Sequence, residues 1–268
     1  MKVVLFCGGL GLRMREESTR VPKPMIPLGE RPILWHIMKY YSDFGFRDFV
    51  LCLGYKAEVI KDYFLNYSEA LSNDFVLAEG GKRVELLGSD THDWSMTFVN
   101  TGLHSTIGER LKRVEPHLED NEVFLATYGD GLTDAPLLEM IDVLVESGKT
   151  GLFLCVHPTY QFHVVSLGDG NDVREIQDVT EANLWINGGY FVFRRRILDY
   201  LLPGEDLAGD AFKRLIAEDE LVAYRYEGFW APMDTLKDKQ TLESLIESGD
   251  PPWRHPRGLD VPGAASPG

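Results

Sequence analysis

Short apolar runs with the length of β-strands alternate with amphipathic stretches along most of the chain, and this alternation limits its fold more than any other feature. Strands are predicted at residues 2–7 (KVVLFC), 48–54 (DFVLCLG), 96–102 (MTFVNTG) and 122–129 (EVFLATYG). The stretches between them have helical periodicity and lie at residues 32–44, 56–65, 107–118 and 136–147. Strands that alternate with helices favour an α/β fold built on a largely parallel sheet.

The pattern changes after residue 147, where several apolar runs follow one another with short turns between them. Strands are predicted at residues 150–158, 162–178 and 183–193, which we expect to join the same sheet in an antiparallel or mixed arrangement. The chain then continues with a predicted helix at 207–218, a strand at 221–228 and a last helix at 239–248.

The 268 residues have the length of one large domain. We predict a single domain over residues 1–248, with a polar, acidic insertion at about 68–94 that is either a mobile flap or an exposed loop. Residues 249–268 are rich in Pro and Gly and are predicted to form an extended tail.

The formal net charge of −15 opposes broad attraction to nucleic acid or anionic lipid, because both partners need a basic surface. No stretch reaches the roughly 18 apolar residues of a membrane helix, and the first residues enter a strand pattern without a signal-peptide core. Cys7, Cys52 and Cys155 lie in separate apolar runs and lack the close spacing of a zinc or redox motif. We therefore expect a cytoplasmic protein with buried thiols that binds neither nucleic acid nor membranes.

Three glycines in four residues follow the first strand, in the stretch FCGGLGLRM. Gly8, Gly9 and Gly11 let the backbone approach a ligand closely, and the successive N–H groups of such a turn can bind the oxygens of a polyphosphate. Arg13 follows two residues later. The stretch matches neither the dinucleotide-binding G-x-G-x-x-G motif nor the Walker A motif.

Lys23 lies between Pro22 and Pro24. Proline restricts its own φ and favours an extended conformation in the residue before it, so Lys23 is predicted to be extended, with little backbone freedom. A lysine held in this way is a good phosphate ligand. The alternative is that Arg13 and Lys23 are solvated charges on a long loop, and the neighbouring glycines favour the phosphate site.

The chain resembles the sugar-phosphate nucleotidyltransferases over residues 8 to about 253. The matching stretches include GGLGLRM, PKPMIPLGERPILWHIM, LGYKAEVIKDYF, NTGLHSTIGERLKRV, YGDGLTD, INGGYFVF, GFWAPMDTLKDK and PPW. Among them, PILWHIM and FWAPMDT favour the cytidylyl branch of the family over the thymidylyl and uridylyl branches.

The resemblance implies transfer of a cytidylyl group from CTP to a sugar 1-phosphate with release of pyrophosphate. Glucose 1-phosphate is the acceptor that it favours. The resemblance also implies a Rossmann-like three-layer α/β fold with a mixed, largely parallel central sheet, a requirement for Mg²⁺ and a homo-oligomer. The family's nucleotide-binding positions fall on Gly8, Gly9, Leu10, Gly11, Leu12, Arg13, Lys23, Ser105, Gly108, Arg110 and Gly129, of which Ser105, Gly108 and Arg110 are assigned to the base.

The resemblance assigns catalysis to Arg13, Lys23, Asp130 and Asp234, with the two aspartates as ligands of Mg²⁺. Asp130 suits this role because it follows a predicted strand and lies between two glycines, at the sheet edge where α/β proteins bind ligands. Mg²⁺ prefers oxygen ligands and commonly takes one or two carboxylates together with substrate phosphates. Each aspartate taken alone is equally consistent with a helix N-cap or a turn.

The acceptor sugar is assigned to Tyr128, His163, Asp178, Asn187 and Gly188. The sequence Asn-Gly-Gly at 187–189 interrupts an apolar strand, and glycine within a strand often marks the close approach of a ligand or of backbone. Tight packing and a β-bulge are the alternatives there.

Three positions depart from the family pattern. Leu12 replaces a threonine near the phosphates and His163 replaces a glycine of the sugar pocket, while Val179 replaces a lysine that meets the sugar's phosphate. The nucleotide side is therefore predicted to be intact and the acceptor side altered, with His163 or Arg174 as substitutes for the lost charge. A different acceptor, a different nucleoside triphosphate and a catalytically silent, nucleotide-binding regulatory protein stay open as alternatives.

Overall fold

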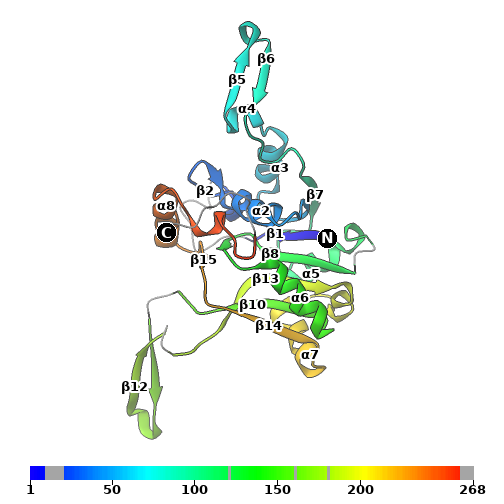
Figure 1. Ribbon diagram of the computed structural model, residues 1–268. Helices are drawn as coiled ribbons and strands as arrows, with labels where there is room; N and C mark the ends of the chain where they lie inside the picture. Colours follow the sequence, from blue (N-terminus) through cyan, green and yellow to red (C-terminus); the bar gives the residue numbers. More distant parts are fainter. Residues whose placement is uncertain (10–20, 120–121, 160–161, 180–181, 260–268) are drawn as a thin grey trace.

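A seven-stranded sheet forms the centre of the computed structural model, which describes residues 1–9, 21–119, 122–159, 162–179 and 182–259 (Figure 1). Within these ranges only one strand of this sheet, β13, runs antiparallel to its neighbours. The predicted mixed, largely parallel α/β fold is thereby confirmed. The strands in spatial order are β14 (Leu221–Tyr226), β10 (Gly151–Val156), β13 (Ile186–Arg194), β8 (Val123–Tyr128), β1 (Lys2–Phe6), β4 (Asp48–Leu53) and β7 (Ser95–Asn100).

Helices cover both faces of the sheet and make a three-layer structure (Figure 1). Side chains along β1 alternate between the two cores, with Val3 and Leu5 in one and Val4 and Phe6 in the other. The first core is closed by α2 (Ile33–Asp43), α3 (Ala57–Leu65), α6 (Leu137–Ser147) and α8 (Leu236–Glu247). The second is closed by α5 (Ile107–Arg113), η6 (Arg195–Tyr200), η7 (Leu207–Ala211) and α7 (Phe212–Ala217). Within the described ranges, no helix has the length and apolar character needed to cross a membrane.

Two helix boundaries differ from their predictions for local reasons. Helix α8 begins three residues before the predicted start at 239, because Thr235 and Asp238 form a reciprocal capping box. Helix α5 begins after the capping box of Thr106 and Glu109, as predicted, but it ends at Arg113, and η4 (Glu115–His117), with a proline at its start, follows.

The prediction that residues 162–178 join the main sheet is wrong. Strands β11 (His163–Leu167) and β12 (Val173–Asp178), joined by η5 (Asp169–Asn171), form a separate two-stranded sheet that projects from the body (Figure 1). The physical reason is that β10 and β13, which precede and follow this hairpin, pair directly with each other and leave no free edge between them.

The predicted insertion at 68–94 contains a second projecting hairpin. It consists of α4 (Glu69–Ser72), β5 (Phe75–Ala78), η3 (Glu79–Gly81) and β6 (Arg83–Leu86), and it lies at the opposite end of the molecule from β12 (Figure 1). Trp94, at the end of this segment, is buried in the first core and donates a hydrogen bond to Ser42. The segment is therefore an exposed hairpin that is anchored at its base.

Two pairs of very short strands were not predicted. Strands β9 (Gly131–Thr133) and β15 (Trp230–Pro232) pair in antiparallel fashion, and β2 (Pro27–Leu28) pairs with β3 (Arg31–Pro32) beside η2 (Lys23–Met25). These elements carry or flank the residues of the candidate site.

The prediction of an extended tail from residue 249 is wrong for its first part. A short helix, η8 (Pro252–Arg254), holds Trp253 at only 2% exposure against the first core. The indole N–H of Trp253 donates to Nδ1 of His36 at 3.4 Å, and Nε2 of His36 donates to the carbonyl oxygen of Leu28 at 2.9 Å. Residues 260–268 lie outside the described residues.

This buried histidine makes the stability depend on pH. Burial lowers the pKa of His36 to about 4, so the unfolded chain binds a proton near pH 6.5 and the folded chain does not. Stability is then fully present above pH 6.5 and is lost as the pH falls toward 4. We expect the free energy of unfolding to fall by about 2 kcal/mol from this group between pH 7 and pH 5. Urea denaturation at both pH values measures it, and His36→Gln is the control, because it should remove this part of the pH dependence. Equal pH dependence in both proteins would contradict the assignment.

Candidate active site

Lys23, Asp130 and Asp234 meet at the carboxyl edge of the sheet. The ammonium group of Lys23 donates to Oδ2 of Asp130 at 2.7 Å and to Oδ1 of Asp234 at 2.5 Å. The lysine side chain is 11% exposed, while those of Asp130 and Asp234 are 35% and 18% exposed. Residues separated by more than 200 positions therefore form one charged cluster that solvent can reach from the side of Asp130.

The β9–β15 pair explains why the two aspartates converge. Asp130 immediately precedes β9 and Asp234 follows β15, and Gly131 lies opposite Pro232 in the antiparallel register. The backbone N–H of Met233 also donates to the carbonyl of Asp130 at 2.8 Å. Both side chains are thus held at the same end of one short ladder.

Gly129 allows the lysine loop to reach this end. A Cβ at residue 129 would lie 3.0 Å from Pro24 and 3.2 Å from the carbonyl oxygen of Phe6. A side chain there would push away the loop that carries Lys23. The close approach at Gly129 is therefore made by the protein's own proline.

The prediction of an extended conformation at Lys23 is wrong. The residue begins the 3₁₀ turn η2, in which Pro22 accepts from Met25 and Lys23 accepts from Ile26 through their backbones. Burial lowers the pKa of Lys23, but the charges and hydrogen bonds of Asp130 and Asp234 outweigh it and the pKa lies above its ordinary value. Lys23 is therefore fully charged at neutral pH.

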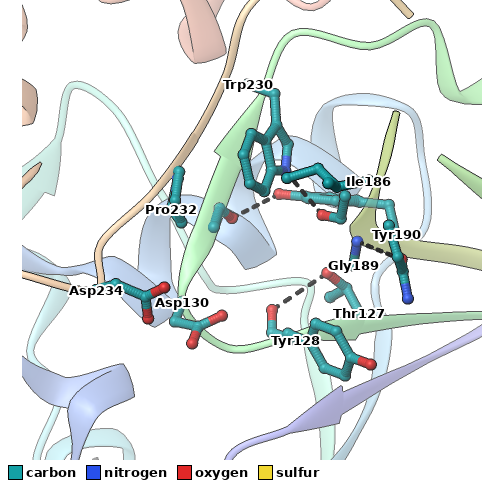
Figure 2. A pocket seen from close by; sticks show the side chains of 12 residues that line it. Thr127, Tyr128, Asp130, Ile186, Gly189, Tyr190, Trp230, Pro232 and Asp234 are labelled. Carbon is teal, nitrogen blue, oxygen red and sulfur yellow. Dashed lines mark hydrogen bonds between the residues drawn. The ribbon is translucent and has the colours of Figure 1, made fainter. Parts of the chain in front are cut away.

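A cavity of about 280 Å³ opens beside the two aspartates (Figure 2). Tyr128 and Asn187 line it, and its other side is closed by the indole of Trp230. Burial raises the pKa of Tyr128 to about 12, so its hydroxyl is neutral. The full lining is Thr127, Tyr128, Asp130, Gly131, Ile186, Asn187, Gly188, Gly189, Tyr190, Trp230, Pro232 and Asp234.

The glycines at 188 and 189 are explained by close contacts within the protein. A Cβ at residue 188 would lie 3.2 Å from the carbonyl oxygen of Leu154, and one at residue 189 would lie 2.5 Å from the ring of Tyr128. Gly189 also has a φ of +79°, which favours glycine. Its N–H donates to Oδ1 of Asn187 at 2.8 Å, which fixes the asparagine at the cavity wall.

Among the residues assigned to the nucleotide, Arg110 lies inside the protein and contacts Gly8. Arg110 is 3% exposed, and its terminal nitrogens donate to the carbonyl oxygens of Gly8, Leu53 and Leu103 and to Oγ1 of Thr101. A Cβ at residue 8 would lie only 1.9 Å from the guanidinium. Gly8 is therefore needed for this contact, and Arg110 holds the carbonyl of Gly8.

The other residues assigned to the nucleotide are placed as follows. Ser105 donates to the carbonyl of Thr101 and accepts from Arg113. Gly108 is buried, and a Cβ there would lie 2.6 Å from the carbonyl oxygen of Glu205. Gly9 is exposed with open space beside it. Predictions for Leu10, Gly11, Leu12 and Arg13 fall outside the described residues, and the assignments of this group to a nucleotide stay predictions.

The structure does not bring His163 and Asp178 to the cavity. They lie opposite each other at the base of the β11–β12 hairpin and are not among the cavity's lining residues. Val179 is fully buried, and Arg174 lies further out on the same hairpin, beside Gly168. Among the described lining residues, no lysine or arginine replaces the lysine of the family pattern.

The donor set at Asp130 and Asp234 suits Mg²⁺. Their carboxylate oxygens already converge on one positive charge, that of Lys23, and oxygen is the ligand that Mg²⁺ prefers. Over the described ranges, no group of three or more His, Cys, Asp or Glu side chains is arranged to hold a metal. A magnesium ion here would hence rely on this pair and on oxygens from the substrates.

Sequence reasoning missed Trp230 as a site residue. The indole N–H donates to the carbonyl oxygen of Gly188 at 2.7 Å, and the ring forms a wall of the cavity (Figure 2). In the sequence, the stretch FWAPMDT indicates only the cytidylyl branch of the family. The weak signal available was an aromatic residue four positions before a predicted metal ligand.

The protein is an open α/β sheet structure with a lysine and two aspartates at the carboxyl edge of the sheet, where proteins of this class bind their ligands. In fold, the chain is similar to a UTP-bound UGPase from Acinetobacter baumannii, with a TM-score of 0.69, 18% identity, and coverage of 94% of this chain and 95% of that one.

Sequence comparison gives the family. The model of the nucleotidyl transferase family matches residues 2–238. A glucose-1-phosphate cytidylyltransferase from Salmonella typhimurium is 41% identical over 257 residues, which cover 95% of this chain and 99% of that protein. A UTP–glucose-1-phosphate uridylyltransferase from Staphylococcus epidermidis is 26% identical over 250 residues, or 85% of each chain. The chain belongs to the nucleotidyl transferase family, which confirms the resemblance seen in its motifs.

Proposed function

We propose that this chain transfers a cytidylyl group from CTP to glucose 1-phosphate and releases pyrophosphate. The observation that carries the proposal is the convergence of Lys23, Asp130 and Asp234 at the edge of the cavity. The choice of CTP and glucose 1-phosphate is supported by the 41% identity to a cytidylyltransferase over nearly the whole chain.

In this reaction a phosphate oxygen of the sugar 1-phosphate forms a bond to the α-phosphorus of CTP, and the bond between that phosphorus and pyrophosphate breaks. No strong base is required, because the second pKa of a phosphate monoester is near 6 and the oxygen is ionised at neutral pH. Position and charge therefore matter most. Lys23 has the fixed position and the positive charge needed to bind the phosphates of CTP. The family pattern adds Arg13, which lies outside the described residues.

Mg²⁺ is part of the proposal, with Asp130 and Asp234 as its protein ligands. When bound, the ion neutralises charge on the phosphates. With the ion bound to the two carboxylates, Lys23 would be free to donate to phosphate oxygens in place of Asp130 and Asp234.

The experiment that tests the proposal is the release of pyrophosphate with Mg²⁺, in which each of four nucleoside triphosphates is combined with a panel of sugar 1-phosphates. We expect the highest kcat/KM for CTP with glucose 1-phosphate. Turnover with another sugar phosphate alone would show that the acceptor is not glucose 1-phosphate. Val179 gives a reason for this outcome, because it is a buried valine at the position where the family pattern has a lysine for the sugar's phosphate. Binding of CTP without turnover on any acceptor would instead support a regulatory role.

We also propose a homo-oligomer, because both projecting hairpins expose an apolar face. Opposite residues of an antiparallel pair share a face, which places Phe75 with Leu86 and Leu77 with Val84 on β5–β6, and Val165 with Ile176 and Leu167 with Val173 on β11–β12. These eight side chains are between 41% and 61% exposed. An isolated two-stranded hairpin is only marginally stable. A second copy of the chain supplies matching apolar faces that can cover both.

A double substitution tests this surface. Val165→Glu with Ile176→Lys is expected to lower the mass in sedimentation equilibrium, since two charges would have to be buried at the contact. Ser166→Glu, on the opposite face of the same hairpin, is the control and should leave the mass unchanged. A monomeric wild-type protein, or an unchanged mass in the double variant, would contradict the proposal.

A cytoplasmic location is proposed as well, which the three buried free cysteines support because reducing compartments keep thiols unpaired.

A further inference from the structure

A second and larger cavity lies behind Trp230. It has a volume of about 610 Å³ and shares Trp230 and Pro232 with the cavity that borders Asp130 and Asp234. The rest of its lining comes from the segment after β10, from the loop that leads into β15, from β15 itself and from the start and one side of α8, where Lys237 and Asp238 are its charged residues.

The indole of Trp230 is held in place between the two cavities. Its N–H donates to the carbonyl oxygen of Gly188 at 2.7 Å, and both residues line the cavity beside Asp130 and Asp234 (Figure 2). Its backbone is fixed by pairing with Thr133 in the β9–β15 ladder. A Cβ at residue 188 would lie 3.3 Å from the indole nitrogen, so Gly188 is also small enough for the ring to approach.

We propose that Trp230 sets the size of the acceptor by closing the site toward this second cavity. The inference rests on the proposed function, because it takes the cavity beside Asp130 as the place of the sugar 1-phosphate. With the indole present, about 280 Å³ is available, enough for an unsubstituted hexose. Without it, the site opens into the larger space.

The lining of the second cavity suits a substituent on a hexose. Phe229, Leu242 and Leu245 offer apolar surface. The hydroxyl of Thr235 accepts from the N–H of Asp238 and can still donate, whereas that of Thr241 donates to the carbonyl of Lys237 and can still accept. An acetamido group has both kinds of surface. A hexose 1-phosphate with an N-acetyl substituent is therefore the class of acceptor that the wild-type wall excludes and that a protein without the indole accepts.

The test compares glucose 1-phosphate with N-acetylglucosamine 1-phosphate in the wild type, Trp230→Ala and Trp230→Phe. We expect Trp230→Ala to raise the ratio of kcat/KM for the acetylated acceptor over that for glucose 1-phosphate by at least about tenfold, since pocket shape discriminates small groups by such factors. Trp230→Phe retains a ring and loses the donor, so it should keep most of the discrimination while KM for glucose 1-phosphate rises. A purely structural role would lower both activities together and leave the ratio unchanged.

Calorimetric titration measures the Kd of each of the two sugar phosphates for each protein. The ratio of the two Kd values reports the same discrimination and does not depend on turnover. A wild type that binds neither compound overturns both the proposed function and the role of Trp230. A wild type that uses glucose 1-phosphate, with a folded Trp230→Ala variant whose ratios stay at the wild-type level, overturns the role of Trp230 alone. Should Trp230→Ala fail to fold, Trp230→Leu makes the same opening with a larger apolar side chain and carries the same expectation.

Discussion

Replacement of Asp130 or of Asp234 by asparagine is expected to lower kcat at least about tenfold, a loss of roughly 1.4 kcal/mol in the transition state, with little change in fold. Asparagine keeps the size of the side chain and removes its charge. An amide oxygen is a weaker ligand for Mg²⁺ than a carboxylate, so the charge that balances the leaving pyrophosphate is reduced.

The structure explains why the fold should survive either change. Lys23 bonds both carboxylates, so each single variant leaves the buried ammonium with one charged partner. The double variant differs, because it would leave that ammonium, 11% exposed, without a carboxylate from this pair, and loss of a partner from a buried ion pair is strongly destabilising. Chemistry and stability are thereby separated by comparing single and double variants.

Steady-state kinetics at several Mg²⁺ concentrations, with thermal unfolding in parallel, measures this expectation. Asp142→Asn is the matched control, since Asp142 is exposed on α6 and does not line the cavity, and its kinetics should be those of the wild type. Near-normal kcat in Asp130→Asn or Asp234→Asn would show that the residue concerned is not a ligand of the catalytic ion.

The fold could be predicted because its signals are local. The strand at 2–7 and the helix after Pro32 carry their own periodicity, and the structure places β1 and α2 at these positions. The convergence of Asp130 with Asp234 has no such signal, since it depends on two strands of three residues each that pair across about one hundred positions. Motif resemblance supplied what periodicity could not.

Other parts of the site depend on contacts that no local pattern encodes. Trp230 meets Gly188 only because β15 pairs with β9 and the start of β13 lies beside them. The projecting β11–β12 hairpin has the alternation of a sheet strand, and only the direct pairing of β10 with β13 excludes it from the sheet. In both cases the missing information is long-range.

Arg110 has a structural role that the family resemblance does not indicate. The family pattern assigns it to the base, and the structure adds hydrogen bonds from its guanidinium to acceptors at or just after the ends of β1, β4 and β7. Gly54 shares this arrangement, because a Cβ there would lie 2.7 Å from the carbonyl of Gly8 and 3.0 Å from Arg110. One guanidinium thus links the ends of three strands through Gly8, Leu53 and Thr101.

Arg110→Met is therefore expected to lower the free energy of unfolding by about 2–4 kcal/mol, because it leaves buried carbonyl oxygens without donors, each a loss of about 1–3 kcal/mol, while removal of a buried charge offsets part of this cost. KM for CTP should also rise at least about fivefold, because the carbonyl of Gly8 loses the guanidinium that holds it in place. KM for the sugar phosphate should stay nearly unchanged.

Urea denaturation and steady-state kinetics measure the two effects, and Lys112→Met is the matched control on the same helix. Lys112 is exposed and bonds Leu198 and Glu115 at the surface, so its loss should cost less than about 1 kcal/mol and leave both KM values as they are. Arg110→Lys should recover only part of the stability, because one ammonium group cannot reach acceptors that the planar guanidinium spans. The contrary result would be an Arg110→Met variant with the same free energy of unfolding as the wild type and a raised KM for CTP alone. The side chain would then act on the nucleotide directly, as the family pattern assigns it, and would not be needed to hold Gly8.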